Sequence, residues 1–153
     1  MTPPEILAAP ATIRQLALRD VSTAVSLVRQ FHGSPLPRSY LQQLLANPVN
    51  YLIVAEVSGQ LAGFLYAHRI DRLSRAETQI FIYEVEVAPE FQRQGIGSAL
   101  IDHILAIARR DGIETFVFTN HSNKAGVEFY KSTGGIIENG DDLLFVYPSA
   151  KDD

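Results

Sequence analysis

The segment that follows the apolar run ending at Val87 combines two glycines with a basic residue. It reads Gln92-Arg93-Gln94-Gly95-Ile96-Gly97-Ser98, and an amphipathic helical pattern begins directly after it. A turn that leads from a strand into a helix directs several unpaired main-chain N–H groups at one point, backed by the positive end of the helix dipole. The glycines allow a large anion to approach this backbone, and Arg93 adds a positive charge. The segment therefore predicts a diphosphate site.

The spacing of these glycines excludes two common nucleotide-binding motifs. A dinucleotide fingerprint, Gly-x-Gly-x-x-Gly, needs a third glycine at the position that Leu100 occupies. A Walker A loop needs Gly-Lys-Ser/Thr at the end of the turn, and that triplet does not follow. On spacing alone, a tight strand-to-helix turn without any ligand explains Gly95 and Gly97 equally well.

The composition of the chain excludes several kinds of chemistry and several classes of partner for this turn. The chain has 153 residues, 46% hydrophobic and 20% charged, which favours one soluble domain and a cytoplasmic location. It has no cysteine, which excludes disulfides, cysteine metal ligands and a cysteine acyl-enzyme. The four histidines show no metal-ligand spacing, and the net charge of −4 disfavours nucleic acid and favours small cations. No apolar run approaches the roughly 20 residues that span a membrane, so we expect no metal, nucleic acid or membrane as partner.

Apolar periodicity predicts one domain over residues 12–153, preceded by a disordered tail, residues 1–11. Strands are expected at 12–16, 51–57, 61–70, 78–87 and 115–120, and helices at 21–31, 40–45, 96–110 and 124–132. Residues 136–138 and 143–147 are expected to pair as a terminal hairpin. Along the chain, strands that are expected to pair antiparallel come first, and crossover connections between parallel strands follow. The expected fold class is therefore α/β (α+β), with a mixed, mostly antiparallel sheet flanked by helices.

The turn and the strand before it resemble the acetyl-coenzyme A signature of the GNAT superfamily of N-acetyltransferases. That signature is Gln/Arg-x-x-Gly-x-Gly/Ala after a strand that ends in Val-x-Pro, and residues 92–97 match it in full. The order of elements also fits this fold over nearly the whole chain. The resemblance implies acetyl-coenzyme A as co-substrate, with backbone N–H contacts from Arg93 to Ser98 to its pyrophosphate. It also implies that Val85 and Val87 pair with the pantetheine arm as an added strand would.

A second segment, residues 123–135, resembles a later motif of the same superfamily, Asn…Ala…Phe/Leu-Tyr…Gly. In that pattern the tyrosine hydroxyl lies near the thioester sulfur, which implies that Tyr130 protonates the departing thiolate. Without the motif, Phe129 and Tyr130 are simply an aromatic pair on a helix face. Asn123 either helps to hold the coenzyme or caps the helix.

Two carboxylates, Glu84 and Glu86, interrupt the apolar run before the turn. A carboxylate buried in such a strand is costly unless it has a partner or a catalytic task. An amine substrate arrives mostly protonated because its pKa is about 10, and only the neutral form attacks a carbonyl carbon. We expect Glu84 to be the base, directly or through water, with Glu86 as second candidate and a backbone N–H near Val85 as donor to the carbonyl oxygen. An ion pair with Arg14 or Arg69, or solvent exposure, is the alternative for Glu84.

Details of the strand and turn are similar to one group of the superfamily, the type I aminoglycoside 3-N-acetyltransferases of gentamicin and fortimicin resistance. Those enzymes have similar lengths, an Arg-Gln-Gly-Ile turn, and a tyrosine followed by an acidic residue at the place of Tyr83-Glu84. Their acidic residue is usually aspartate, one methylene shorter than Glu84. A short insertion between Gly135 and Asp142 is a second departure, which adds Asp141 and Asp142. The resemblance implies the 3-amino group of an aminoglycoside as the substrate.

A polycationic substrate needs an anionic cleft, and acidic residues are available to line one. The expected substrate-binding residues are Tyr83, Glu84, Glu86, Glu138, Asp141 and Asp142, with Glu56, Asp71 and Glu77 as further acidic candidates. Two other hypotheses stay open: a GNAT enzyme for a protein N-terminus, a polyamine or an amino acid, and a non-catalytic acyl-coenzyme A-binding module. Analogy with relatives that pair through edge strands favours a homodimer.

Overall fold

The computed structural model describes residues 10–150, which fold around a five-stranded sheet with the strand order β1-β2-β3-β4-β5. The strands are β1 (Thr12–Gln15), β2 (Asn50–Val57), β3 (Gln60–Asp71), β4 (Thr78–Val87) and β5 (Glu114–Val117). Neighbouring strands are antiparallel except for the parallel pair β4–β5. The expected mixed, mostly antiparallel sheet is confirmed. Of the expected N-terminal tail, residues 1–9 lie outside the described residues.

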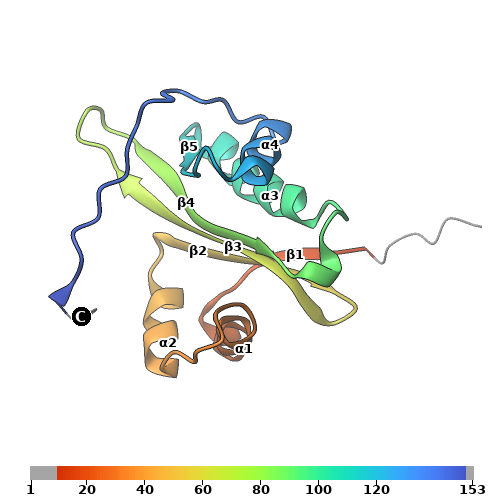
Figure 1. Cartoon of the computed structure of the whole chain (residues 1–153). Coiled ribbons are helices and arrows are strands. Elements are labelled where there is room, and N and C mark those ends of the chain that lie inside the picture. Colours follow the sequence, from red (N-terminus) through yellow and green to blue (C-terminus); the bar gives the residue numbers. More distant parts are fainter. Residues whose placement is uncertain (1–9, 151–153) are drawn as a thin grey trace, which may run out of the picture.

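Helices cover both faces of the sheet (Figure 1). α1 (Val21–His32) and α2 (Arg38–Ala46) lie on one face, and α3 (Ile96–Asp111) and α4 (Lys124–Ser132) lie on the other. Gly33 and Gly112 end α1 and α3 in the left-handed conformation, with φ angles of 75° and 67°. Glycine adopts this conformation without the steric cost of a Cβ atom. No described helix is long and apolar enough to cross a membrane.

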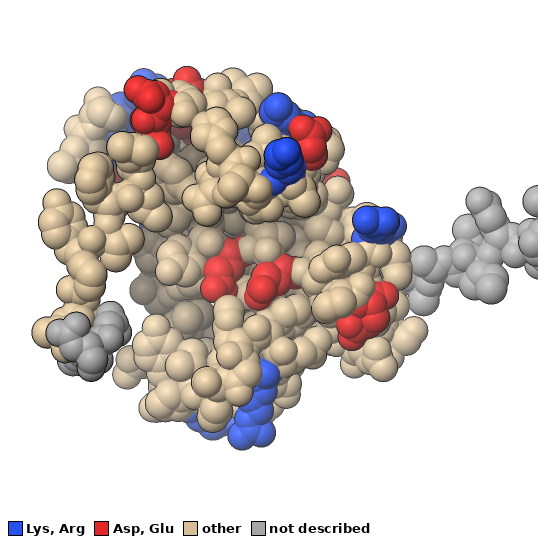
Figure 2. All heavy atoms as spheres, viewed as in Figure 1, with Lys and Arg blue, Asp and Glu red and all other residues tan. Residues whose placement is uncertain are grey.

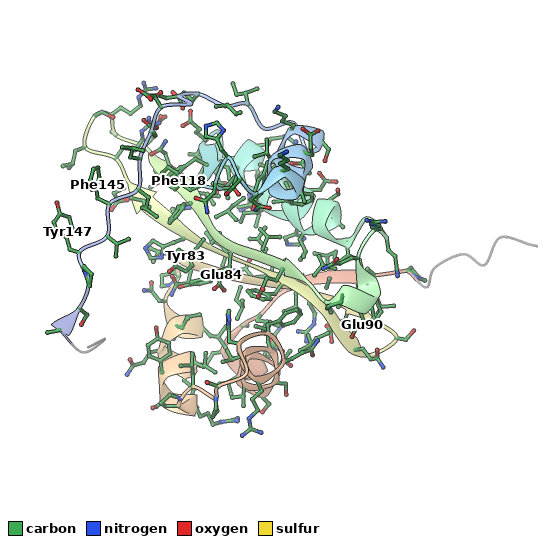
Figure 3. All side chains as sticks on the ribbon, viewed as in Figure 1. Tyr83, Glu84, Glu90, Phe118, Phe145 and Tyr147 are labelled. Carbon is green, nitrogen blue, oxygen red and sulfur yellow. The ribbon has the colours of Figure 1, made fainter. Side chains whose placement is uncertain are left out.

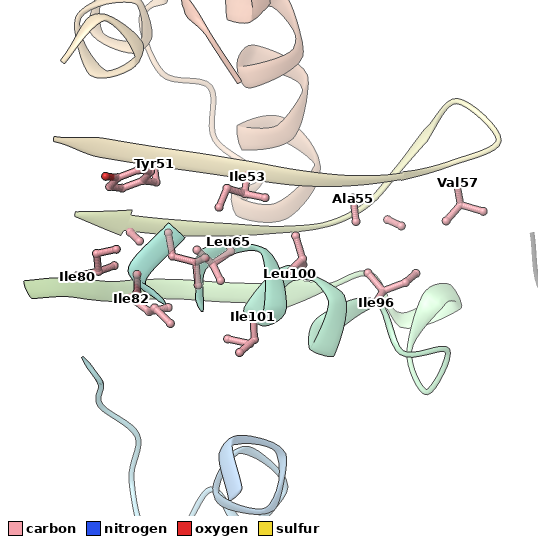
Figure 4. Packing of buried hydrophobic residues seen from close by; sticks show 14 residues of the cluster. Tyr51, Ile53, Ala55, Val57, Leu65, Ile80, Ile82, Ile96, Leu100 and Ile101 are labelled. Atoms are coloured by element: carbon pink, nitrogen blue, oxygen red, sulfur yellow. The ribbon is translucent and has the colours of Figure 1, made fainter. Parts of the chain in front are cut away.

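The larger of two hydrophobic cores lies between α3 and the sheet (Figure 4). Leu100 and Ile104 of α3 pack there against Ile53 and Leu65, which lie on the neighbouring central strands β2 and β3. The second core joins α1 and α2 to the opposite face, where Phe64 is buried. Both faces of β2 and of the middle of β3 are therefore covered, which explains why β2 and residues 62–67 of β3 are almost continuously buried.

Leu100→Ala is expected to lower the free energy of unfolding by about 2–5 kcal/mol, because it leaves a cavity at a fully buried position of the larger core. Urea denaturation followed by circular dichroism measures this change. Leu73→Ala is the matched control, because Leu73 is fully exposed in the loop between β3 and β4 and should change stability by less than about 0.5 kcal/mol. Equal effects of both variants would contradict the assignment of this core.

β4 contains a bulge where its pairing with β3 shifts by one residue. Tyr66 pairs with Glu84, whereas the next residue of β3, Ala67, pairs with Ile82, so Tyr83 has no partner on β3. A bulge changes which side chains face each side of a strand. Ile82 faces the α3 core, and regular alternation would place Glu84 there as well. The bulge instead turns Glu84 toward α1 and α2.

β5 pairs with only part of β4. It pairs with residues 79–82 of β4 and ends at Val117, earlier than the expected strand 115–120. Among residues 10–150, no strand lies beside residues 83–87 of β4 on the β5 side. β4 therefore has an open backbone edge directly before the turn that leads into α3.

The expected terminal hairpin is wrong. The polar turn at its centre does form: the Asp141 amide donates to Asn139 Oδ1 at 3.0 Å, and His121 Nε2 lies 3.2 Å from the Gly140 carbonyl oxygen. Residues 136–138 and 143–147 nevertheless form no strand. The alternation of apolar residues predicted pairing because it reports β propensity, but it does not specify where a partner strand lies.

Candidate active site

The turn between β4 and α3 is braced by two glutamine side chains. Gln92 Nε2 donates to the Val87 carbonyl oxygen at 3.1 Å, and Gln94 Nε2 donates to the Glu90 carbonyl oxygen at 3.2 Å. Arg93 and Gly95 both have positive φ angles, 62° and 80°. The chain thereby reverses direction within a few residues and enters α3 at Ile96.

The amides of this turn point away from internal partners. The first main-chain hydrogen bond of the α3 N-terminus runs from the Ala99 amide to the Gly95 carbonyl oxygen, at 3.0 Å. The amides of residues 93–98 make no hydrogen bond to any part of the chain that the structure describes. Unpaired amides at a helix N-terminus attract anions, because the helix dipole adds to their partial positive charge. This is the geometry that a diphosphate site requires.

A cavity of about 210 Å³ lies beside these amides. Its lining combines the turn, the end of β4 and one aromatic ring of α4, and consists of Val87, Phe91, Gln92, Arg93, Gly95, Ile96, Gly97, Ser98 and Phe129. The structure thus brings together most of the residues that were expected to bind the coenzyme. Val85 lies two residues earlier on the open edge of β4.

Glycine is needed at the two positions of the turn for different structural reasons. Gly95 has a φ of 80°, and a Cβ atom there would meet nothing within 4 Å. A Cβ atom on Gly97 would lie 3.1 Å from the Phe129 ring, which also lines the cavity. Of the two explanations given for these glycines, a tight turn and space for an anion, the positive φ of Gly95 supports the tight turn. Gly95 serves the backbone conformation, and Gly97 permits close packing of α3 on α4.

The segment around α4 positions Tyr130 and Asn123 differently. Asn123 caps α4: its Oδ1 accepts from the Gly126 amide at 3.1 Å, and its Nδ2 donates to Thr119 Oγ1 at 3.0 Å. Tyr130 packs against the larger core and is half-buried. Burial raises the pKa of the Tyr130 hydroxyl above that of free tyrosine, so this group keeps its proton at neutral pH. Asn123 was expected either to help hold the coenzyme or to cap the helix, and the structure shows the cap.

Glu84 has a histidine as its partner rather than an arginine. His32 Nε2, at the end of α1, lies 3.2 Å from Glu84 Oε2, and both side chains are partly exposed. Arg14 instead pairs with Glu56 and Asp20. Arg69, the second arginine considered as a partner of Glu84, pairs with Asp111.

The premise that Glu84 and Glu86 are buried is wrong. No charged side chain is buried in the described part of the chain, and Glu86 is exposed. Glu86 pairs with Phe64 across the strands and so shares the α1–α2 face with Glu84. Figure 2 shows acidic side chains in a hollow at the centre of the molecule, and Figure 3 places Glu84 there on β4. We call this hollow, with the side chains of His32, Tyr66, Tyr83, Glu84 and Glu86, the α1–β4 groove.

Tyrosines form one wall of the α1–β4 groove. The bulge residue Tyr83 is largely exposed, and its ring packs edge-on against Tyr66 with 6.2 Å between centroids. Tyr66 also borders a polar cavity of about 210 Å³ between α2 and strands β2 and β3. This cavity is lined by Tyr40, Gln43, Leu44, Asn47, Asn50 and Tyr66. Its neutral amide and hydroxyl groups suit hydrogen bonding to a polar substrate.

Sequence reasoning missed His32, Asn50 and the two tyrosines of this polar cavity. Asn50 is central there, because its Oδ1 accepts from the Tyr66 hydroxyl at 3.3 Å and lies 2.7 Å from His68 Nδ1. These residues come from helices and strands far apart in the chain, so no local spacing could have indicated them.

The remaining acidic candidates do not gather around Glu84. Glu138, Asp141 and Asp142 are exposed on the segment after α4, which runs past the α3–α4 side of the sheet (Figure 1). Glu56 pairs with Arg14, and Glu77 pairs with Arg72 and Arg75. Roles for Glu138, Asp141 and Asp142 in substrate binding therefore remain predictions. Among the described residues, no cluster of side chains could hold a metal ion.

The fold and the site define the class of protein. A central mixed sheet, a bulged β4, an open β4 edge and an anion-binding turn into α3 are the parts that an acyl-coenzyme A-dependent N-acetyltransferase needs. Residues 18–134 match the acetyltransferase (GNAT) family. The chain belongs to this family, whose enzymes use acetyl-coenzyme A as co-substrate.

Similar proteins fall into two groups with different substrates. N-alpha-acetyltransferase RimI of Mycobacterium tuberculosis is 30% identical over 127 residues, which cover 82% of this chain and 78% of that protein. The [ribosomal protein bS18]-alanine N-acetyltransferase of Escherichia coli K12 is 26% identical over 125 residues, 80% of this chain and 79% of that protein. An aminoglycoside acetyltransferase from an uncultured soil metagenomic sample, solved in complex with sisomicin, superposes with a TM-score of 0.82 at 25% identity, covering 91% of this chain and 95% of that chain.

Proposed function

We propose that this chain transfers the acetyl group of acetyl-coenzyme A directly to a primary amine, in a complex that holds both substrates. The observation that carries the proposal is the set of unpaired amides at residues 93–98 beside a cavity, next to the open edge of β4. The absence of cysteine supports direct transfer, because it excludes a cysteine acyl-enzyme and leaves only another nucleophile as the alternative.

The coenzyme is held by main-chain groups more than by side chains. The amides of residues 93–98 bind its diphosphate, and the Arg93 guanidinium adds a positive charge. The open edge of β4 at Val85 and Val87 pairs with the amides of the pantetheine arm. Gln92 and Gln94 keep the turn in shape through their hydrogen bonds to main-chain carbonyls. Asn123 belongs with these supporting residues, because both ends of its side-chain amide are used within the protein.

Three groups of this chain act on the reacting atoms. Glu84 accepts a proton from the ammonium group, directly or through water, so that the neutral amine forms a C–N bond with the acetyl carbon. A main-chain N–H near Val85 donates to the carbonyl oxygen as negative charge develops on it. The C–S bond then breaks, and Tyr130 gives its proton to the departing thiolate. His32 positions the Glu84 carboxylate through their 3.2 Å contact.

Tyr130→Phe is expected to lower kcat by about 100-fold, because the thiolate must then leave without a proton donor. Coenzyme affinity should change little, since the diphosphate contacts remain. Burial raises the Tyr130 pKa, so the acid form persists at neutral pH and is lost only as the pH rises through that raised value. The variant should therefore lack the alkaline fall in kcat of the native chain. Tyr147→Phe, at an exposed tyrosine, is the control and should behave as the native chain; an unchanged kcat for Tyr130→Phe would remove Tyr130 from the mechanism.

An aminoglycoside is the substrate that we place first. Glu84 and Glu86 make the α1–β4 groove anionic, and the exposed Tyr83 ring offers a surface on which a sugar ring packs. The fold similarity to an aminoglycoside acetyltransferase solved with sisomicin supports this choice. The neutral polar cavity next to the groove suits the hydroxyl groups of such a compound.

The N-terminal amine of a protein is the second candidate. It is supported by the relatives that acetylate protein N-termini, which are as similar in sequence as the aminoglycoside enzymes. It is also supported by the small number of acidic side chains in the groove, because a peptide N-terminus carries one positive charge whereas an aminoglycoside carries several.

A thiol-release assay with acetyl-coenzyme A and a panel of amines tests both proposals. The panel contains gentamicin, sisomicin, spermidine and a peptide with an N-terminal alanine. We expect the highest kcat/KM with an aminoglycoside, and product analysis by mass spectrometry and NMR should place the acetyl group on its 3-amino nitrogen. Faster turnover of the peptide would establish the second candidate and contradict the first. Binding of coenzyme without release of thiol from any amine would contradict both and favour a non-catalytic binding module.

A further inference from the structure

Three tyrosines from three different elements gather at one end of the α1–β4 groove. Tyr40 comes from α2, Tyr66 from β3 and Tyr83 from the bulge of β4. Tyr40 and Tyr66 line the same polar cavity, and the Tyr66 ring packs edge-on against Tyr83 with 6.2 Å between centroids. Tyr40 is 55% exposed and Tyr83 is 64% exposed, so a ligand in the groove can reach both rings. We call these three residues the tyrosine cluster.

The Glu84 carboxylate lies beside the tyrosine cluster. Glu84 is the cross-strand partner of Tyr66 and follows Tyr83 directly in β4 (Figure 3). Burial raises the pKa of the Tyr66 hydroxyl, and the nearby Tyr40, Glu84 and Tyr83 raise it further. A carboxylate that disfavours the phenolate form of Tyr66 attracts a cation to the same place, for the same electrostatic reason.

The α1–β4 groove has an excess of negative charge. Its defining side chains include two carboxylates, Glu84 and Glu86, and one histidine, so a negative charge remains even when His32 is protonated. Figure 2 shows mostly uncharged residues around the acidic side chains of this hollow. The one basic residue of α2, Arg38, is directed toward α1 and donates to Ser22 Oγ at 3.2 Å. The groove therefore accommodates a further cation.

The amine that reacts is not that cation. In the proposed function it loses its proton to Glu84 before it attacks the acetyl carbon, so it is neutral when the C–N bond forms. The face of an aromatic ring attracts a cation that lies within about 6 Å of the ring centroid. The cavity beside the rings adds the side-chain amides of Gln43 and Asn47, whose oxygens accept hydrogen bonds from N–H groups. The tyrosine cluster therefore suits an ammonium group that stays charged throughout the reaction.

We propose that the tyrosine cluster binds a second ammonium group of the substrate, which keeps its charge and is not acetylated. The proposal rests on the proposed function, because it takes Glu84 as the place where the reacting amine lies. It narrows the substrate class to diamines and larger polycations, and it disfavours a peptide whose only cation is its N-terminus. Because Glu84 adjoins the cluster, the two nitrogens are expected to lie only a few bonds apart, as on one six-membered ring.

A cation that cannot be acetylated tests the tyrosine cluster without any transfer reaction. Choline carries a quaternary ammonium group, and 3,3-dimethylbutan-1-ol has the same shape without the charge. NMR titrations of the chain without coenzyme measure both dissociation constants. We expect choline to bind at least about 5-fold more tightly than the alcohol, with its methyl proton signals moving upfield over the rings. Equal affinities, or no binding of choline, would overturn the proposal.

Tyr83→Leu removes one exposed ring of the cluster at a residue that belongs to neither hydrophobic core. We expect its choline affinity to fall by about 5-fold, and Tyr83→Phe, which keeps the ring, to recover most of that loss. Tyr147→Leu is the matched control, because it removes an exposed tyrosine elsewhere and should bind choline as the native chain does. Circular dichroism checks that each variant is folded. A folded Tyr83→Leu with native choline affinity would contradict the assignment.

A matched pair of acceptors connects the tyrosine cluster to turnover. In cis-3-aminocyclohexanol a hydroxyl replaces one of the two ammonium groups of cis-1,3-diaminocyclohexane, while the ring stays the same. In a thiol-release assay we expect kcat/KM to be at least about 10-fold higher for the diamine, well beyond the factor of about two from its two amines, and the ratio to fall in Tyr83→Leu. Equal kcat/KM values for the two amines would overturn the proposal. Selective choline binding without thiol release from either amine would contradict the proposed transfer and leave the cation site established.

Discussion

Ser98→Glu is expected to weaken the binding of acetyl-coenzyme A by about 100-fold, or about 3 kcal/mol, while leaving the fold intact. Ser98 is a partly exposed residue in the first turn of α3 and lines the cavity beside the unpaired amides. A carboxylate there repels the diphosphate and competes for the same N–H groups. The loss should diminish at high salt, because screening weakens the repulsion.

Ser98→Glu should weaken coenzyme binding without lowering the stability of the fold, so the two effects can be measured separately. A glutamate in the first turn of a helix interacts favourably with the helix dipole, so Ser98→Glu should be at least as stable as the native chain. Ser98→Gln is the matched control, with nearly the same shape and no charge, and should retain affinity within a few-fold. Isothermal titration calorimetry measures both. Equal affinities for the two variants would show that no anion binds at this turn.

Glu84→Gln is expected to lower kcat by about 100- to 10,000-fold with little change in coenzyme affinity. Glutamine keeps the size of the side chain and one acceptor oxygen, but its amide cannot accept the proton of the ammonium group. Raising the pH should partly restore the rate, because a larger fraction of the amine is then neutral and needs no base to remove its proton. Steady-state kinetics at several pH values measures both effects.

Glu86→Gln is the control for that substitution. Glu86 lies on the same face of β4 but has no contact like that between His32 and Glu84. Its loss should raise the KM of a cationic substrate and lower kcat by less than about 10-fold. If Glu86→Gln lowered kcat more than Glu84→Gln did, Glu86 rather than Glu84 would be the base. If neither variant lost activity, the proton would have to leave by another route.

The parts of the site that lie within one stretch of chain could be predicted from the sequence. The turn at residues 92–98 and the helix after it depend on glycine conformation, helix start signals and apolar periodicity, which act over a few residues. For the same reason β4 and α4 have the expected bounds, Thr78–Val87 and Lys124–Ser132. The elements that form the proposed coenzyme site were therefore predicted from the sequence, whereas the binding of coenzyme by their residues stays a prediction.

The substrate side of the site depends on tertiary structure, and the sequence was less informative there. Alternation along β4 would place Glu84 in the α3 core with Ile82, and only the bulge at Tyr83 turns it toward His32. Nothing within the strand indicates that Tyr83 has no partner. The polar cavity around Asn50 likewise combines α2, β2 and β3, whose packing no local pattern reports.

The C-terminal segment shows a different kind of failure. Its residues have the composition of a strand, and a turn forms before them, with hydrogen bonds from Asp141 to Asn139 and between His121 and Gly140. The pairing itself does not form among the described residues. Strand propensity indicates that a segment favours extended backbone, whereas the identity of its partner strand depends on tertiary structure.

Coenzyme recognition by main-chain amides underlies the whole proposed function, and NMR observes those amides directly. A titration of the ¹⁵N-labelled chain with coenzyme A should move the amide proton signals of residues 93–98 downfield, because each of them gains a hydrogen bond to a charged oxygen. The Gly59 amide, in the turn between β2 and β3, should stay in place. Binding that shifts signals elsewhere and leaves those of residues 93–98 unchanged would contradict the account.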